Sequence, residues 1–170
     1  MISTMLTLLS RRKLEQNYDL GYWRDDTIFS LVRHHATAIP DKVAVRDRSS
    51  EMTYRELASR AEALSAAIKA AGLQPGNRVA VWLCSRIEVA IALVACSHGG
   101  YVCCPSLHRD HTSSEVIELM ERMRAAAFIG EAGYGADASR RDIFADLDRV
   151  STLKTVFKLG PVDGHDELPL

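Results

Sequence analysis

The sequence lacks an excess of charge of either sign. Its 170 residues contain 21 Lys and Arg against 22 Asp and Glu, which gives a formal net charge of −1. Proteins that hold nucleic acid or an anionic membrane surface by electrostatic attraction usually carry a basic excess or a basic patch. The even balance gives no reason to expect a nucleic-acid partner, and we expect none.

The sequence also lacks a long apolar run. No stretch reaches the roughly 20 apolar residues that a transmembrane helix needs, so we expect no transmembrane segment. The mildly apolar start, Met1–Leu9, comes before the basic residues Arg11, Arg12 and Lys13. A secretory signal has the reverse order, with its basic residues first. We therefore predict a cytoplasmic protein.

Cysteine is scarce, with four residues and no CxxC pair, which favours reduced and largely buried thiols. Cys103, Cys104, His108 and His111 have the residue types of a zinc site. However, adjacent strand residues point to opposite faces, so Cys103 and Cys104 cannot easily share one ion. The C-x4-H-x2-H spacing also lacks a second pair of ligands. We predict no metal site.

What the sequence does contain is the composition of an ordinary globular domain. Apolar residues make up 47% and charged residues 25%, both typical of such proteins. A length of 170 residues favours a single domain. Hydrophobic periodicity is weak over residues 1–20, and the polar run from Asn17 to Gly21 indicates irregular structure. We predict an N-terminal extension over residues 1–20 and one α/β domain over residues 21–170.

Helical and extended patterns alternate along this domain. Apolar spacing predicts a helix over residues 27–38, capped by Asp26 or Thr27, and then a hairpin formed by residues 43–45 and 51–53. Strands are expected near residues 79, 102, 127 and 155, with helices between them and a short last helix over 142–150. Crossovers of this length join parallel strands. The predicted fold class is therefore α/β, an open, mostly parallel sheet with helices on both faces, plus an N-terminal helix and hairpin.

Three Ser/Thr-x-x-Glu patterns predict helix starts. They begin at Thr53, Ser85 and Thr112, and each could form a capping box in which the first and fourth residues satisfy each other's backbone amides. We interpret Ser85 as a cap rather than a nucleophile, because no Gly-x-Ser-x-Gly elbow surrounds it. The helix over residues 89–96 is apolar on every face, which predicts burial on both sides.

Five segments follow one another along the chain: Gly21-Tyr22-Trp23, Pro40–Val45, Met52–Leu57, Gly72–Val81 and Gly99–Val102. Their order and spacing resemble the adenylate-forming ligases, which include acyl-CoA synthetases, aryl-CoA ligases, luciferases and the adenylation domains of peptide synthetases. Tyr101, Cys103 and Cys104 depart from the small or aliphatic residues usual in that family, and Cys84 stands where Asn is common. The resemblance covers about residues 21–160.

The resemblance implies the N-terminal portion of an AMP-forming carboxylate–CoA ligase. Such enzymes use ATP, with Mg²⁺, to convert a carboxylic acid to an acyl-adenylate, and coenzyme A (CoA) then displaces AMP. The family's Ser/Thr/Gly-rich phosphate loop ending in Pro-Lys-Gly does not occur in this sequence. We therefore expect no catalytic residue within the chain, no ATP or CoA bound to it alone, and no ligase activity of its own. The Gly130–Gly135 stretch lacks a Lys and is interpreted as a surface loop.

One residue is a candidate for ligand binding. Arg109 follows the strand expected near residue 102, and ligands of open α/β sheets bind outside the carboxyl ends of the strands. In some CoA ligases a basic residue at the matching position contacts the CoA nucleotide phosphate, so the resemblance implies that role for Arg109. A solvated loop arginine is the alternative. His108 and His111 are interpreted as loop histidines, because no carboxylate or nucleophile is visibly paired with them.

The resemblance also implies partners. These are the remainder of the same polypeptide and a small carboxylic acid, because the family's other motifs would lie beyond Leu170. Gly21-Tyr22-Trp23 with Asp25-Asp26-Thr27 resembles members acting on cyclic or aromatic acids, such as cyclohexanecarboxylate- or aryl-CoA ligases. A fragment of this kind should expose apolar surface and self-associate. The alternative is a stand-alone, non-catalytic α/β binding or interaction module with a remnant of the ligase fold.

Overall fold

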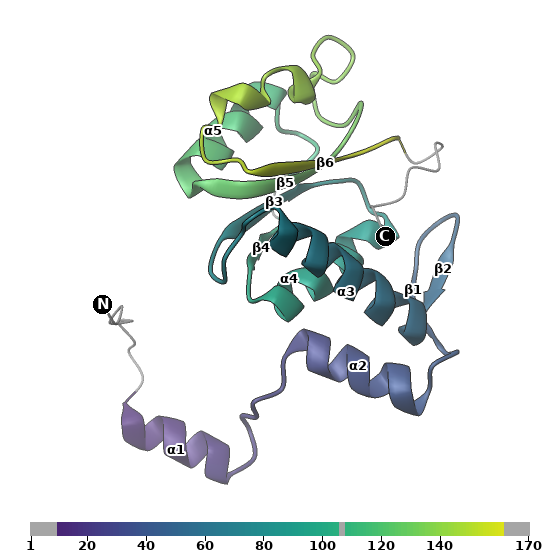
Figure 1. The fold of residues 1–170 in the computed structure, drawn as a ribbon, viewed down its shortest axis with the longest axis vertical. Helices are drawn as coiled ribbons and strands as arrows, with labels where there is room; N and C mark the ends of the chain where they lie inside the picture. Colours follow the sequence, from purple (N-terminus) through teal and green to yellow (C-terminus); the bar gives the residue numbers. More distant parts are fainter. Residues whose placement is uncertain (1–9, 106–107, 162–170) are drawn as a thin grey trace.

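A four-stranded parallel sheet forms the centre of the molecule. The computed structural model describes residues 10–105 and 108–161, so the predictions for Met1–Leu9 lie outside the described residues. The sheet order is β4-β3-β5-β6, and all neighbouring strands are parallel. This confirms the predicted fold class (Figure 1). The strands are β3 (Arg78–Trp82), β4 (Val102–Cys104), β5 (Ala125–Glu131) and β6 (Thr155–Leu159).

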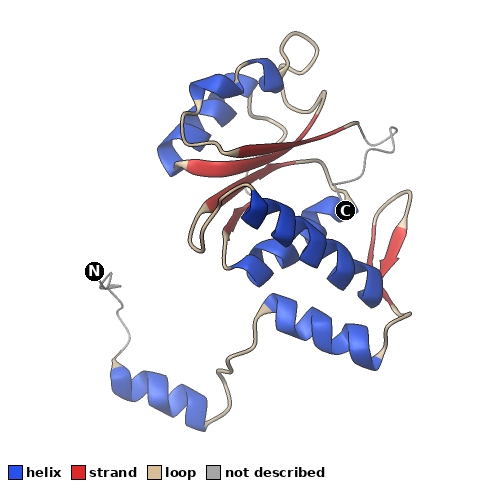
Figure 2. Cartoon of the chain, viewed as in Figure 1, coloured by secondary structure: helices blue, strands red, loops and turns tan. Residues whose placement is uncertain are grey.

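Helices cover both faces of the sheet (Figure 2). On one face lie α2 (Ile28–Ala38), α3 (Tyr54–Ala70) and α4 (Ile87–Gly99), whose apolar side chains share a core with Val79, Val81 and Ile129. On the other face lie α5 (Ser113–Met123) and two short 3₁₀ turns, Ile143–Ala145 and Leu147–Arg149, which pack around Trp82 and Phe128. All seven residues of β5 are buried, as expected for a parallel strand covered on both sides.

A small antiparallel hairpin joins α2 to α3. It consists of β1 (Val43–Arg46) and β2 (Glu51–Thr53), as the sequence predicted. Thr53 also caps α3, since its hydroxyl accepts from the Glu56 amide while the Glu56 carboxylate accepts from the Thr53 amide. The predicted capping box at Thr112 forms in the same way at the start of α5.

The third predicted capping box is wrong. Helix α4 begins at Ile87, its N-cap position is Arg86, and no side chain of the α4 segment caps it. The Ile87 amide donates instead to Asp47 Oδ2 at 3.0 Å, from the loop between β1 and β2. A carboxylate from a distant segment thus replaces the local hydroxyl that the Ser85 pattern indicated, and Ser85 is not the cap.

The N-terminal segment differs from its prediction. The predicted extension contains helix α1 (Arg11–Asp19), and the last three residues of this helix belong to the run expected to be irregular. The helix has no buried residue and lies apart from the rest of the chain (Figure 1). The sequence gives no periodicity here because a helix that buries nothing needs no apolar stripe. The division between an extension and a domain near residue 20 stays a prediction.

Three further expectations need correction. The predicted helix over residues 142–150 is a pair of 3₁₀ turns, and the predicted surface loop from Gly130 begins too early, because Gly130 and Glu131 end the buried strand β5. Helix α4 is also not buried on every side. Its Leu93 is 40% exposed, so one flank of this apolar helix faces solvent.

Candidate functional site

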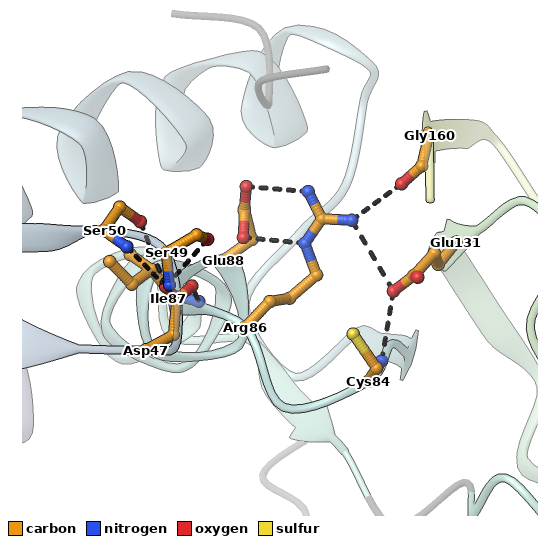
Figure 3. A network of polar contacts seen from close by, with 9 residues as sticks. All are labelled: Asp47, Ser49, Ser50, Cys84, Arg86, Ile87, Glu88, Glu131 and Gly160. Atoms are coloured by element: carbon orange, nitrogen blue, oxygen red, sulfur yellow. Dashed lines mark hydrogen bonds and ion pairs between the residues drawn. The ribbon is translucent and has the colours of Figure 1, made fainter. Parts of the chain in front are cut away.

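A buried arginine joins three strand ends at the carboxyl edge of the sheet (Figure 3). Arg86 follows β3, and its guanidinium donates to both oxygens of Glu88, at 2.8 and 2.9 Å. A third donor, Nη1, reaches the carbonyl oxygen of Gly160 after β6 at 2.8 Å, and lies 3.5 Å from Oε2 of Glu131 at the end of β5. Only 6% of the Arg86 side chain and 7% of the Glu131 side chain are exposed.

Glu131 also holds the end of β3. Its Oε2 accepts from the Cys84 amide at 3.2 Å. Burial, together with a hydrogen bond to the Glu131 carboxylate, raises the pKa of the Cys84 thiol to about 12. The nucleophilic form of cysteine is the thiolate, so Cys84 stays a neutral thiol near pH 7 and is not an activated nucleophile.

These charges occupy the place where open α/β sheets usually bind ligands. The chain runs from β3 out to β4 and then returns to the other side of β3 with β5, so the strand order reverses between β3 and β5. Ligands commonly bind in the crevice outside the carboxyl ends at such a point. Here the buried Arg86–Glu131 pair lies at the ends of β3 and β5, and the open space lies next to it, with Arg86 among its lining residues.

A second network fixes the hairpin against α4. One carboxylate oxygen of Asp47 accepts from the amides of Ser49 and Ser50, at 3.0 and 2.9 Å, and the other accepts from the Ile87 amide. These hydrogen bonds, that from the Ser49 amide above all, lower the pKa of Asp47 to about 2. Asp47 therefore stays ionised under ordinary conditions and holds two segments 40 residues apart in sequence.

The open space next to both networks is a groove of about 900 Å³, which we call the hairpin groove. Its walls are the β1–β2 hairpin, the segment from the end of β3 into α4, and the loop after β4. A volume of this size suits a small organic ligand. Its lining residues are Val45, Arg46, Asp47, Arg48, Cys84, Ser85, Arg86, Ile87, Val89, Ala90, Leu93 and Arg109. A smaller pocket of about 220 Å³ adjoins it, next to Cys84, Pro105 and Tyr134.

The predicted ligand contact lies at this groove. Arg109 is exposed on the loop after β4 and lines the groove, and among the described residues it has no hydrogen-bonded or ion-paired partner. His108 and His111 are on the same loop, with ring centroids 6.1 Å apart. The carbonyl oxygen of His108 accepts from the buried Trp82 indole at 3.0 Å, so this loop is tied to the core through its backbone.

The zinc-like set does not come together as a ligand cluster. Cys103 packs against the core on the α4 side of the sheet, whereas the neighbouring Cys104 contacts the Val102 carbonyl at 3.7 Å. Within residues 10–105 and 108–161, no group of three or more His, Cys, Asp or Glu side chains could hold a metal ion. The same residues contain no helix long and apolar enough to cross a membrane.

Sequence reasoning missed the residues that organise this edge. Asp47 lies in a polar run that predicted only a turn, and nothing in its neighbourhood indicated a helix 40 residues away. Arg86 lies within the Ser85–Glu88 pattern, which was wrongly interpreted as a capping box, so its own role was not considered. Glu131 did give a signal in the sequence, because it follows the apolar residues of a predicted strand. A carboxylate at the end of such a strand is buried only when it has a partner, so its position indicated a buried polar contact.

The chain folds as a parallel α/β domain with an open groove next to the end of β3 and the loop after β4. The chain belongs to the AMP-binding enzyme family, which it matches over residues 32–169. This confirms the family that the sequence segments indicated.

Known relatives are ligases considerably longer than this chain. One from Rhodococcus jostii, named 3-[(3aS,4S,7aS)-7a-methyl-1,5-dioxo-octahydro-1H-inden-4-yl]propanoyl:CoA ligase, is 29% identical over 144 residues, covering 82% of this chain and 27% of the relative. The 2,3-dihydroxybenzoate-AMP ligase of Bacillus subtilis is 30% identical over 153 residues, covering 88% of this chain and 27% of the relative. The chain thus spans about a quarter of the length of these relatives.

Solved structures show the same relationship. The apo structure of Mycobacterium smegmatis MbtA is 30% identical and superposes with a TM-score of 0.67, covering 85% of this chain and 26% of that one. The N-terminal subdomain of Klebsiella oxytoca NpsA, in complex with 3-hydroxybenzoyl-AMSN, is 25% identical with a TM-score of 0.55. It covers 61% of this chain and 26% of that one.

Proposed function

We propose that this chain is the N-terminal part of an AMP-forming carboxylate–CoA ligase. In the proposed reaction a carboxylate oxygen attacks the α-phosphorus of ATP, accompanied by Mg²⁺, and pyrophosphate leaves. The CoA thiol then attacks the acyl carbon, and AMP leaves. The observation that supports this most is the family match over residues 32–169, together with relatives named as CoA and AMP ligases.

We propose that the chain by itself is a scaffold without ligase activity. The charged residues best placed to act at its sheet edge, Arg86 and Glu131, are engaged with each other and with the backbone. The Cys84 thiol beside them is kept neutral. Catalysis, and the binding of ATP and Mg²⁺, would then depend on the remainder of the same polypeptide.

For the chain itself we propose one ligand contact, between Arg109 and a phosphate of CoA. Its position on the loop after β4, at the rim of the hairpin groove, supports this role. Its lack of a partner among the described residues leaves the guanidinium available to a phosphate.

We also propose a cyclic or aromatic acid as the substrate. The names of two relatives, one containing a fused-ring propanoyl group and one a dihydroxybenzoate, support this choice. The proposed compartment is the cytoplasm, which the four free cysteines support, because thiols stay reduced there. Self-association of the 170-residue chain is a further part of the proposal and is tested below.

The proposal is tested by extending the coding sequence past Leu170 and assaying the product. We expect an in-frame continuation that contains a Ser/Thr/Gly-rich loop ending in Pro-Lys-Gly. The longer protein should catalyse ATP–pyrophosphate exchange that depends on added cyclic or aromatic acid. A stop codon directly after Leu170 would instead support the stand-alone interaction module.

A further inference from the structure

The hairpin groove is lined by several charged residues, and the proposed function assigns a role at the groove to only one of them, Arg109. Four arginines and one carboxylate, Asp47, are among its lining residues. Two of the arginines are committed elsewhere, since Arg46 pairs with Glu51 at 2.7 Å and Arg86 belongs to the buried network. The other two, Arg48 on the hairpin and Arg109 on the loop after β4, come from separate walls of the groove.

Arg48 is available to a ligand in the same way as Arg109. It is exposed, and within the described part of the chain no hydrogen bond, ion pair or ring contact engages either guanidinium. The one carboxylate in the lining does not compete for them, because Asp47 directs its oxygens to the amides of Ser49, Ser50 and Ile87. Those contacts also fix the residue next to Arg48 against α4, so the hairpin wall has a defined position.

The lining of the groove also has an apolar part. It includes Val45, Val89, Ala90 and Leu93, and the Leu93 side chain on α4 is 40% exposed. An inorganic anion would leave this surface unused. A ligand that combines phosphate groups with an apolar or flat organic part would use both features, and would bury Leu93.

We propose that the hairpin groove binds an amphipathic organic phosphate and that Arg48, on the hairpin, is an anion-binding residue of this groove in addition to Arg109, on the loop after β4. The Ile87 amide at the start of α4 is already bonded to Asp47, so the phosphate is met by side chains rather than by the helix terminus. This inference deepens the proposed function and rests on it for the choice of CoA as the ligand.

The test is calorimetric binding of CoA to the purified 170-residue chain and to four variants. Arg48→Ala and Arg109→Ala each remove one guanidinium, Arg48→Lys keeps the charge, and Arg33→Ala is the matched control. Arg33 is an exposed arginine on α2 that does not line the groove. Pantetheine, which has the organic arm without a phosphate, is the second ligand, and both are titrated at two salt concentrations.

This inference departs from the expectation, drawn from the sequence, that no CoA binds to the chain alone. Because two arginines without a partner among the described residues line the groove, we expect the chain to bind CoA and to bind pantetheine more weakly. Arg48→Ala and Arg109→Ala should each weaken CoA binding about tenfold, the typical worth of one charge-assisted hydrogen bond, and should reduce its salt dependence. Arg48→Lys should lose less, and Arg33→Ala should match the unmodified chain. The inference is overturned if Arg48→Ala binds CoA as tightly as Arg33→Ala, or if the chain binds no CoA at millimolar concentration.

These outcomes are distinct from failure of the proposed function. ATP–pyrophosphate exchange reports acyl-adenylate formation, which precedes the CoA step. Acid-dependent exchange by the longer protein, combined with no effect of Arg48→Ala, would reject the role of Arg48 and leave the ligase. CoA binding that requires Arg48, combined with no exchange by the longer protein for any acid, would reject the ligase and leave the groove.

Discussion

Asp47 shows how much one exposed-loop residue can organise. Its carboxylate caps a helix that begins 40 residues later and at the same time closes the loop of its own hairpin. A side chain that stays ionised while it accepts several amide hydrogen bonds favours the folded state only in its charged form. The contribution of Asp47 to stability should therefore depend on pH.

We expect Asp47→Asn to reveal that dependence. The folded-state pKa of Asp47, about 2, lies below its ordinary value of 3.8, so the stabilising effect is complete above pH 4 and is lost as the pH falls through 2. Urea melts of both proteins between pH 2 and pH 7 would measure it. The gap in unfolding free energy should be largest near neutrality and should shrink in acid. A gap that is constant across this range would contradict the assigned role.

Single residues were also the hardest features to predict from the sequence. Thr53 and Thr112 were found because their partners lie three residues away in the same segment. Asp47 and Arg86 were not, because their partners come from segments that only the folded chain brings together. Arg109 was placed at the correct edge of the sheet, since any residue following a parallel strand must lie there.

At the scale of elements, α4 and the strand ends around it are held by charges rather than by a local cap. The Arg86–Glu131 pair and the bond to the Gly160 carbonyl connect the ends of β3, β5 and β6. A buried ion pair of this kind adds little stability compared with apolar residues, but losing one partner is costly because the other remains buried and charged.

Replacing Arg86 by Met should therefore destabilise the chain strongly. We expect a loss of about 3 kcal/mol, because the Glu131 carboxylate is left buried without its cation. The double variant Arg86→Met/Glu131→Gln should regain a large part of that loss. As a control, Arg141→Met breaks an ion pair with Asp146, whose side chains are 39% and 30% exposed, and should cost less than about 1 kcal/mol.

Guanidinium chloride melts of the four proteins would decide this prediction. If Arg86→Met and Arg141→Met lose equal stability, the buried network does not hold the strand ends together.

Regular elements, unlike this network, could be predicted well, because apolar periodicity and turn residues are local signals. Two elements were exceptions. Helix α1 buries nothing and leaves no such signal, and the helix predicted over residues 142–150 is a pair of 3₁₀ turns.

At the scale of the whole molecule, the middle of the sheet is covered, because all seven residues of β5 are buried. Its outer strands are covered less completely, since Val102 on β4 is 46% and Val156 on β6 is 39% exposed. The large apolar side chains with the highest exposed fractions belong to the N-terminal segment from α1 to α2, where Tyr22 is 74%, Leu20 56% and Leu31 48% exposed. Contiguous exposed apolar surface usually marks an interface, and these side chains are the candidates to form one.

We therefore expect the 170-residue chain to self-associate through its N-terminal segment. Light scattering over a concentration series should show mass increasing with concentration, and a dye specific for apolar surface should bind. The triple variant Leu20→Ser/Tyr22→Ser/Leu31→Ser should stay monomeric, whereas Val156→Ser, at an exposed valine on β6, should behave like the unmodified chain. A chain that is monomeric and binds no dye would favour the stand-alone module.

Acid-dependent ATP–pyrophosphate exchange by the purified 170-residue chain tests the central claim most directly. The chain belongs to a ligase family, yet its sheet edge holds an engaged ion pair and a neutral thiol in place of free catalytic groups. With a panel of cyclic, aromatic and fatty acids, we predict exchange at background, while a complete adenylate-forming ligase assayed in parallel is active. Exchange above background that requires an added acid and elutes with the chain during purification would contradict the account.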